Sequence, residues 1–409
     1  DGFTYTPPTD YKALATHNLP EPTVTDPSAY FKALTYTGNS DSVNPRNVTG
    51  FQDASGTNIT PDFVWVKSRS NAYSHTLWDS VRGFGNGKEI MSDSQNAEGS
   101  QAGGNGNVSG VVAGGFTATE SGSDSVYVNE QGVTYVAWML KAGGAPSADN
   151  TGDRTPTNNS VMKGGVAQTA SNYLAAADIY PKRMSIAAHG GFSIIRYTAN
   201  NTADQTIPHG LDAAPDFIIE KDLGRSQAWN THTPLGLYYG PLSGSSAFVS
   251  STKPFAVEPT ATLITLWDGA GTNYTNDGTT DHILYCFAKT PGLIGIGIYT
   301  SNDSTDGPHV IVDDGASGFR PAFVMLKAIQ GSQNWRIHDS ARDGYNGSVE
   351  GLFPNTSGQE DTEDVMDMVA NGFKIRSAND NVNGGTAGTD KYVYIAFAEQ
   401  PFGLNNRAR

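Results

Sequence analysis

The sequence has little of what would assign it to a common functional class. It contains one cysteine, Cys286, so no intramolecular disulfide can form. No apolar run approaches the roughly 18 residues of a membrane-spanning helix, and no signal-peptide-like apolar segment is present. Because the chain begins at Asp1, we expect a processed product or a piece of a longer protein.

Basic residues are also scarce. The chain has 26 Lys and Arg against 41 Asp and Glu, a formal net charge of −15. A nucleic-acid-binding domain needs a basic face, so we expect no nucleic-acid partner. The acidic residues are dispersed along the chain, which indicates a well-solvated surface rather than an acidic tail.

Motifs of common enzymes are missing. There is no G-x-S-x-G, H-E-x-x-H, P-loop or Rossmann glycine signature, so we expect no enzyme and no cofactor. Neighbouring carboxylates do occur, in "VDDG" and "QEDTED". A glycoside hydrolase needs two carboxylates at a set separation, and nothing in the sequence shows that these face each other.

What the chain does have is a set of landmarks repeated three times in the same order. The stretches "YTGN", "YTAN" and "YTSN" are each followed by a Pro-to-Lys run, "PDFVWVK", "PDFIIEK" and "PAFVMLK". A segment pairing Trp with His comes next, and an aromatic-rich run closes each unit. Landmarks in a fixed order predict an internal repeat, and we expect the Tyr-Thr-x-Asn stretches to be strand ends.

The spacing of the repeats predicts the domain organisation. Pro61, Pro215 and Pro321 lie 154 and 106 residues apart (215 − 61 and 321 − 215), so a module has roughly 105 residues, the size of a small domain. The first interval then contains an insertion of about 50 polar residues, which we interpret as a long loop. The predicted parts are an extended connector (1–29), module 1 (30–144), the loop insertion (145–190), module 2 (191–291) and module 3 (292–409).

The predicted fold class is all-β. The 47 glycines cluster with Asn, Ser, Thr and Asp between runs rich in β-branched and aromatic residues, a pattern typical of short strands joined by turns. We expect three tandem antiparallel β-sandwich-like modules of six or seven strands, with long loops and little helix. One helix is expected within "EDTEDVMDMVANGF", ending at Gly372.

The Trp/His pairs are the first candidates for chemistry. Modules 2 and 3 read W-x-x-H (Trp229/His232, Trp335/His338), whereas module 1 reads H-x-x-W (His75/Trp78). A metal ligand cannot be exchanged for Trp, but two large amphipathic rings can exchange in a packing role. We therefore predict core packing, with ligand contact as the alternative.

Two further candidates are weaker. Cys286 lies in an apolar run and is interpreted as a small buried hydrophobe, with a catalytic thiol as the alternative. The stretch from Asn379 to Asp390 has oxygen-bearing residues at EF-hand-like offsets, but its low charge predicts poor Ca²⁺ affinity. We interpret it as a hairpin turn and expect no metal, with Ca²⁺ kept as the alternative.

Module 2 differs most from the others. It lacks the "DS-R" turn of "DSVRG" and "DSARD" and has "PLGLYYGPLSG" instead. Adjacent residues of a strand point to opposite faces, so at least one of Tyr238 and Tyr239 should be exposed. Exposed aromatic residues on a β-scaffold loop suit contact with sugars or protein surfaces. Tyr238 and Tyr239 are the candidate ligand-binding residues, with ordinary loop packing as the alternative.

The order "YTGN…PDFVWVKSRS…DSVRG…TYVAWMLKAGG…GFSIIRYT" closely resembles a module of virion proteins of tailed bacteriophages, especially marine ones, described as tail-fibre or receptor-binding proteins. The opening "FTYTPPTDYKALATHNLPEP" looks like the connector that follows a SPRY-like β-sandwich in such proteins. The resemblance covers almost the whole chain and departs from the pattern in the insertion at 143–190 and in module 2.

The resemblance implies an adhesive virion component and transfers no catalytic residue. We expect an extracellular virion protein, in the tail, that forms a homo-oligomer (a trimer) and contacts other virion proteins and a host glycan or outer-membrane protein. A purely structural capsid or tail part, a polysaccharide depolymerase and a cellular adhesin are the alternatives.

Overall fold

The computed structural model describes residues 22–39, 45–101, 104–120, 126–170, 173–251, 254–267, 275–342 and 350–401. The fold is all-β, as predicted, because the only helical segment among these residues is the 3₁₀ turn η2 (Pro27–Ala29). No helix in the described part of the chain has the length and apolar character needed to cross a membrane. Most of the predicted connector (1–29) lies outside the described residues.

Strands lie in the residue ranges of all three modules. Module 1 contains β1 (Phe31–Thr37), β2 (Arg46–Thr49), β3 (Phe63–Ser68), β4 (Thr76–Asp79), β5 (Asn107–Val112), β6 (Gly115–Thr119) and β7 (Thr134–Leu140). Module 2 contains β11 (Phe192–Thr198), β12 (Gln205–Pro208), β13 (Phe217–Asp222), β14 (Asn230–His232), β15 (Tyr238–Tyr239), β16 (Val249–Ser250), β17 (Leu263–Leu266) and β18 (Asp281–Phe287). Module 3 contains β19 (Ile294–Thr300), β20 (His309–Ile311), β21 (Phe319–Ala328), β22 (Arg336–Asp339), β23 (Met366–Val369), β24 (Gly372–Ile375) and β25 (Lys391–Pro401).

One strand order recurs in all three modules. The larger sheets contain β1-β7-β3-β4, β11-β18-β13-β14 and β19-β25-β21-β22. The smaller sheets are β2-β6-β5, β12-β17 and β20-β24-β23. A separate apolar core lies in each module, as in module 1, where Val64 and Trp78 of the larger sheet cluster with Val48 and Phe116 of the smaller sheet. Each module is thus a two-layered β-sandwich.

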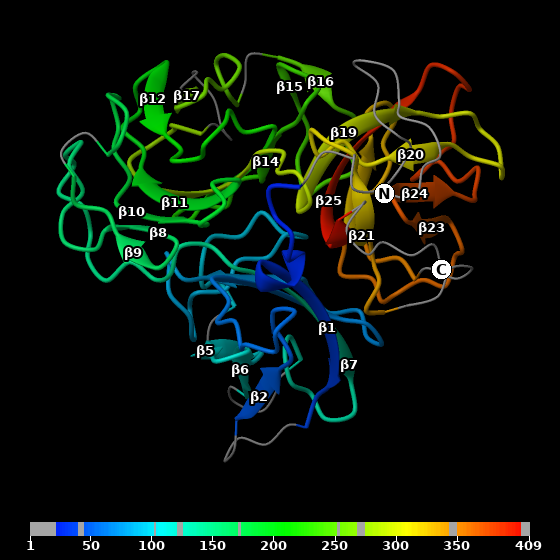
Figure 1. Ribbon diagram of the computed structural model, residues 1–409, viewed down its shortest axis with the longest axis horizontal. Helices are drawn as coiled ribbons and strands as arrows, with labels where there is room; N and C mark the ends of the chain where they lie inside the picture. Colours follow the sequence, from blue (N-terminus) through cyan, green and yellow to red (C-terminus); the bar gives the residue numbers. More distant parts are fainter. Residues whose placement is uncertain are drawn as a thin grey trace, which may run out of the picture.

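A fourth core joins the modules. Alternate residues of the larger sheets, which point away from the sandwich interiors, form one apolar cluster that includes Trp138 of module 1, Tyr285 of module 2 and Phe323 of module 3. Figure 1 shows the three modules arranged around this centre, with module 1 in blue to cyan, module 2 in green and module 3 in yellow to red. Both faces of each larger sheet are therefore buried, which is why every residue of β3 and β13, and all but the first of β7, is buried.

The arrangement is closed, because each module contacts the next in the same way. A backbone N–H of one module donates to the carbonyl that follows the β3-type strand of its neighbour. The three bonds are Glu98 to Leu223 (3.0 Å), Phe248 to Ile329 (2.9 Å) and Glu360 to Arg69 (2.9 Å). They run from module 1 to module 2, from module 2 to module 3, and from module 3 back to module 1.

The Tyr-Thr-x-Asn stretches are strand ends, as predicted. They end β1, β11 and β19, and each tyrosine hydroxyl donates to a backbone carbonyl of the same module, that of Val128, Thr275 or Val382. The asparagine N–H then donates to the side chain of a buried asparagine, with distances of 3.1 Å (Asn39 to Asn129), 3.0 Å (Asn200 to Asn276) and 3.0 Å (Asn302 to Asn383). The hydrogen bonds of the repeated stretch therefore attach the strand end to the turn before the closing strand.

Two expectations differ from the structure. The predicted helix within 360–373 is wrong: residues 366–369 form β23, which turns into β24. Met366 and Met368 are buried with period 2, and Gly372 lets β24 approach β20, because a Cβ there would lie 1.9 Å from the Val310 carbonyl oxygen. The insertion is more than a loop, because it contributes β8 (Val161–Lys163), β9 (Val166–Ala167) and β10 (Arg183–Ile186), which extend the larger sheet of module 2 beyond β11.

Candidate functional site

The Trp/His pairs pack in the interior, as predicted. Each of the six side chains is at most 4 % exposed. The Trp229 indole N–H of module 2 donates to the Met91 carbonyl of module 1 (2.8 Å), and that of Trp335 in module 3 donates to the Pro241 carbonyl of module 2 (3.0 Å). The Trp229 and Trp335 rings therefore join neighbouring modules, whereas His75 Nδ1 accepts the indole N–H of Trp65 within module 1 (3.0 Å).

Cys286 is a buried hydrophobe. Its side chain is fully buried in the core of module 2, and burial raises the pKa of the thiol. A thiol with a raised pKa contains little of the reactive thiolate at neutral pH, so the alternative of a catalytic thiol has no support from its surroundings.

The stretch from Asn379 to Asp390 is a network of turns. The Asn379 side-chain oxygen accepts the N–H of Asn381, and the Asn381 side-chain oxygen accepts the N–H of Asn334. Asp390 accepts the N–H of Thr386. The oxygens that a Ca²⁺ ion would need already accept hydrogen bonds here. In the part of the chain that the structure describes, no group of three or more His, Cys, Asp and Glu side chains is placed to coordinate a metal.

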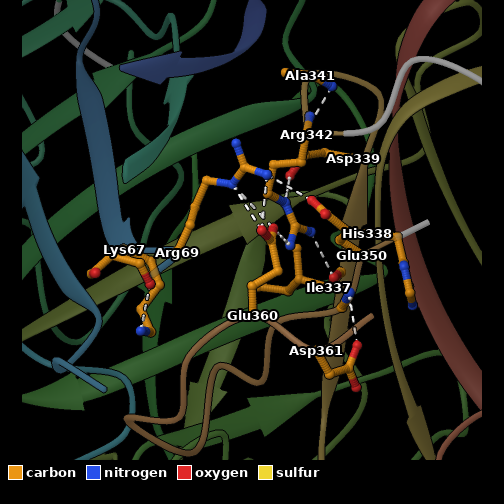
Figure 2. Close-up of polar contacts among 12 residues, drawn as sticks. Lys67, Arg69, Ile337, His338, Asp339, Ala341, Arg342, Glu350, Glu360 and Asp361 are labelled. Carbon is orange, nitrogen blue, oxygen red and sulfur yellow. Dashed lines mark hydrogen bonds and ion pairs between the residues drawn. The ribbon is translucent and has the colours of Figure 1, made fainter. Parts of the chain in front are cut away.

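The "QEDTED" stretch contributes to an ionic cluster between modules 1 and 3. Arg69 contacts Glu350 at 2.6 Å and Glu360 at 2.9 Å, and Arg342 contacts Glu360 at 2.8 Å. Figure 2 shows Arg69 and Arg342 both pointing toward the Glu360 carboxylate. The two guanidinium groups lower the pKa of Glu360, with Arg342 the larger contribution, whereas burial and the Glu360 charge raise the pKa of Glu350.

Two carboxylates with pKa values displaced in opposite directions can mark an acid–base pair, but the contact between arginine and glutamate recurs in module 1. Glu98 of module 1 occupies the position of Glu360, and its carboxylate contacts Arg82 at 3.0 Å as Glu360 contacts Arg342. Arg82 and Arg342 form the same turn, each with its Nε 2.6 Å from the aspartate three residues earlier. The cluster is therefore part of the scaffold that joins the modules.

Module 2 lacks this turn at the corresponding place. Phe63 pairs with Asp79 and Phe323 with Asp339. In module 2, Ile218 pairs with His232, so Thr233, the residue directly after β14, takes the place of the aspartate. The chain forms a similar turn elsewhere, at the end of β13, where the Arg225 Nε lies 2.6 Å from Asp222.

The segment after β14 forms a short arm that comprises residues 233–251 and 254–258. Figure 1 shows its hairpin, β15 and β16, beside the junction of modules 2 and 3. Phe248 is the anchor: it is buried, its ring lies 5.9 Å from that of Trp335, and its N–H donates to Ile329 of module 3. Gly240 leaves room for the Phe248 ring, because a Cβ at Gly240 would lie 3.1 Å from that ring.

The arm exposes apolar side chains. Tyr238 is 37 % exposed, Val249 47 % and Val257 49 %, whereas Tyr239 is half-buried. The prediction that at least one of the two tyrosines would be exposed is confirmed. Val249 gives no such signal in the sequence, since it pairs with Tyr239 only through the hairpin.

A histidine and a glutamate lie at the base of the arm. His232 Nε2 is 3.5 Å from Glu258 Oε2, and the His232 ring packs against Phe255 at 5.9 Å. Burial lowers the pKa of His232 to about 4 and raises that of Glu258. His232 is therefore neutral at pH 7, and the two side chains form a weak contact under the exposed surface of the arm.

Residues 26–171 and 167–401 match the family described as Domain of unknown function (DUF7483). The chain belongs to this family. The two matches together extend over all three modules and the insertion, so the family spans nearly the whole described structure. No curated protein matches the chain.

Proposed function

We propose that the protein is a virion component of a tailed bacteriophage that attaches the particle to its host by binding a surface glycan or protein. The resemblance of its repeated landmarks to tail-fibre modules supports the phage assignment. The binding role is inferred from the difference between the features that the three modules share and the feature that module 2 has in addition. Features shared by the modules are buried and join the scaffold, whereas the exposed apolar arm occurs in module 2, where the shared turn is missing.

The arm has the properties of a contact surface. Isolated apolar residues on a surface are ordinary, but here a tyrosine and two valines protrude from one anchored segment. A tyrosine supplies apolar area and a hydroxyl at little conformational cost. The buried Phe248 fixes the base of the arm, so less entropy is lost when a ligand binds.

The proposal includes assembly into a homotrimer in the tail, where it contacts other virion proteins. The inner faces of the three modules are buried in the shared core, so contacts between copies use the outer surfaces. Several copies on one particle let modest single-site affinities combine into strong attachment. The mechanism is binding without turnover.

The test is attachment to cells. The fluorescently labelled full chain is added to intact candidate host bacteria, with heat-unfolded chain as the control. The expected result is saturable binding that competes with adsorption of a phage carrying this protein. If the folded chain fails to bind cells that this phage infects, the structural alternative (a capsid or tail part) replaces the proposal.

A further inference from the structure

A pocket of about 230 Å³ opens between the insertion and module 2. The insertion contributes Lys163, Tyr173 and Leu174 to its wall, and module 2 contributes Pro208, Leu211 and Asp212. The insertion adds β10, β8 and β9 to the β11 edge of module 2. The larger sheets of modules 1 and 3 have no such added strands among the described residues, so this pocket is specific to module 2. Like the arm, it is a departure from the shared scaffold.

The polar side of the pocket is an ion pair in solvent. Lys163 Nζ lies 2.7 Å from Asp212 Oδ1, with side chains that are 27 % and 63 % exposed. Such an exposed pair contributes little to stability, so its ammonium and carboxylate can exchange this bond for bonds to a ligand. Together they offer one strong donor and one strong acceptor without net charge.

The backbone that carries the carboxylate is fixed by Gly190. The Asp212 N–H donates to the Gly190 carbonyl at 3.0 Å, and the side chain lies directly against Gly190. A Cβ at Gly190 would come within 2.1 Å of Asp212 Oδ2, and the φ of Gly190 is +69°. Both observations require glycine at this position, because a side chain would clash and be strained.

The other side of the pocket is apolar with one aromatic ring. Leu174, Leu211 and Pro208 lie beside the half-buried Tyr173. Burial, reinforced by the Asp212 charge, raises the pKa of Tyr173 to about 12, so its hydroxyl remains a hydrogen-bond donor at physiological pH. The pocket is smaller than the roughly 300–1,000 Å³ of sites for drug-sized ligands.

We propose that this pocket binds a single neutral sugar unit of a glycan. A sugar ring has an apolar C–H face that suits Tyr173 and Leu211, and neighbouring hydroxyls that can accept from Lys163 and donate to Asp212. The balanced charge of the pair favours a neutral ligand over an anion or a cation. The inference rests on the proposed function and deepens it by naming a glycan and a second contact site apart from the arm.

The test is saturation-transfer NMR with the full chain and the methyl glycosides of glucose, galactose, mannose and N-acetylglucosamine as probes. We expect transfer to at least one of them, and binding at least about tenfold weaker in Asp212→Asn and in Lys163→Met, since each loses a charge-assisted hydrogen bond. The matched control is Asp313→Asn, which removes another exposed aspartate 2.7 Å from a lysine, Lys289, outside the pocket. Thermal unfolding shows that each variant is folded.

The outcomes separate this inference from the proposed function. Loss of transfer in the pocket variants, with Asp313→Asn and Tyr238→Ser unchanged, supports the pocket. Transfer that Tyr238→Ser abolishes and Asp212→Asn leaves intact overturns the pocket and places the glycan at the arm. If none of the probes binds while the chain still attaches to cells, the sugar pocket is refuted and the attachment function stands.

Discussion

Trp138 of module 1 donates its indole N–H to the Asp339 carboxylate of module 3 across 2.9 Å, in the buried centre of the molecule. Tyr285 of module 2 makes the corresponding contact with Asp79 of module 1 at 2.8 Å. At the third junction both polar groups are replaced: Ile395 occupies the position of Trp138 and Thr233 that of Asp339. The aromatic donor and the carboxylate acceptor are thus both present at two junctions, and both are replaced at the third.

Asp339→Asn is expected to destabilise the protein strongly. The carboxylate also lies 2.6 Å from the fully buried Arg342 and accepts two backbone N–H groups of its own turn. Removing one partner of a buried ion pair costs about 3–5 kcal/mol, although Glu360 still contacts Arg342. Urea unfolding of the two proteins measures the difference.

Thr233→Val is the matched control at the third junction. The Thr233 hydroxyl is buried without a hydrogen-bond partner among the described residues. Replacing an unsatisfied hydroxyl by a methyl group is expected to be neutral or stabilising by up to about 1 kcal/mol. Equal destabilisation by both variants would contradict the role assigned to the Asp339 carboxylate.

The stability of the protein is expected to rise with pH above about 8. The lysines that close the Pro-to-Lys runs, Lys67, Lys221 and Lys327, are buried, and burial lowers each pKa to about 8. Between this value and about 10.4 the unfolded chain holds more protons than the folded chain, so the free energy of unfolding increases by up to about 1.4 kcal/mol per pH unit for each lysine.

Urea unfolding at about pH 7.5 and pH 9.0, where unfolded tyrosines are still mostly protonated, measures this slope. Lys327→Met should reduce it, because it removes a buried ammonium with a lowered pKa, which donates to the Ala328 and Ser245 carbonyls. The half-exposed Lys88 provides the control variant, Lys88→Met. A slope that Lys327→Met leaves unchanged would be inconsistent with a lowered pKa at this site.

Much of each module could be predicted from the sequence, because the relevant signals are local. The ends of β1, β11 and β19, the burial of Trp229 and the exposure of at least one of Tyr238 and Tyr239 follow from short-range patterns of residue type. The predicted helix failed for a physical reason: Met366, Met368 and Val369 suit a helical face as well as a strand, and pairing with β24 decides between them.

The closed arrangement could not be predicted in the same way. Trp138 and Asp339 are 201 residues apart in the chain, and neither has a neighbour in sequence that indicates the other. The pocket has the same origin, because Lys163 and Asp212 meet only after β10 adds to the edge of β11. Contacts of this kind depend on how complete modules pack.

Three histidines, the buried His209 and His232 and the half-buried His189, are expected to stay neutral well below pH 6.5. Burial lowers the pKa values of His189, His209 and His232 to about 4. Since the unfolded chain binds protons at about pH 6.5, stability contributed by these side chains is present above that pH and is lost as pH falls toward 4. NMR of the imidazole Cε1 protons, assigned by single His→Asn variants, should show no titration between about pH 8 and pH 5. A midpoint near that of a histidine in a short peptide would refute this.

Gly292→Ala is expected to be more destabilising than Gly132→Ala. Both glycines have a positive φ, +84° and +79°, so both substitutions introduce the same backbone strain. A Cβ at Gly292 would in addition lie 2.3 Å from the Val24 carbonyl oxygen, where the N-terminal segment crosses the start of module 3, whereas Gly132 faces open space. Thermal unfolding measures the difference, and equal melting temperatures would show that the segment at Val24 yields without cost.

The most direct test of the attachment function is a comparison of cell binding by two surface variants. Tyr238→Ser removes the exposed ring of the arm, and Ile311→Ser removes a side chain that is 57 % exposed on β20 of module 3, outside the arm. Labelled Tyr238→Ser chain is expected to bind intact host cells at least about tenfold more weakly than the unmodified chain, because aromatic residues in a contact surface often dominate the binding energy. Ile311→Ser is expected to bind as the unmodified chain does. Unchanged binding by Tyr238→Ser, or an equal loss in both variants, would contradict this expectation.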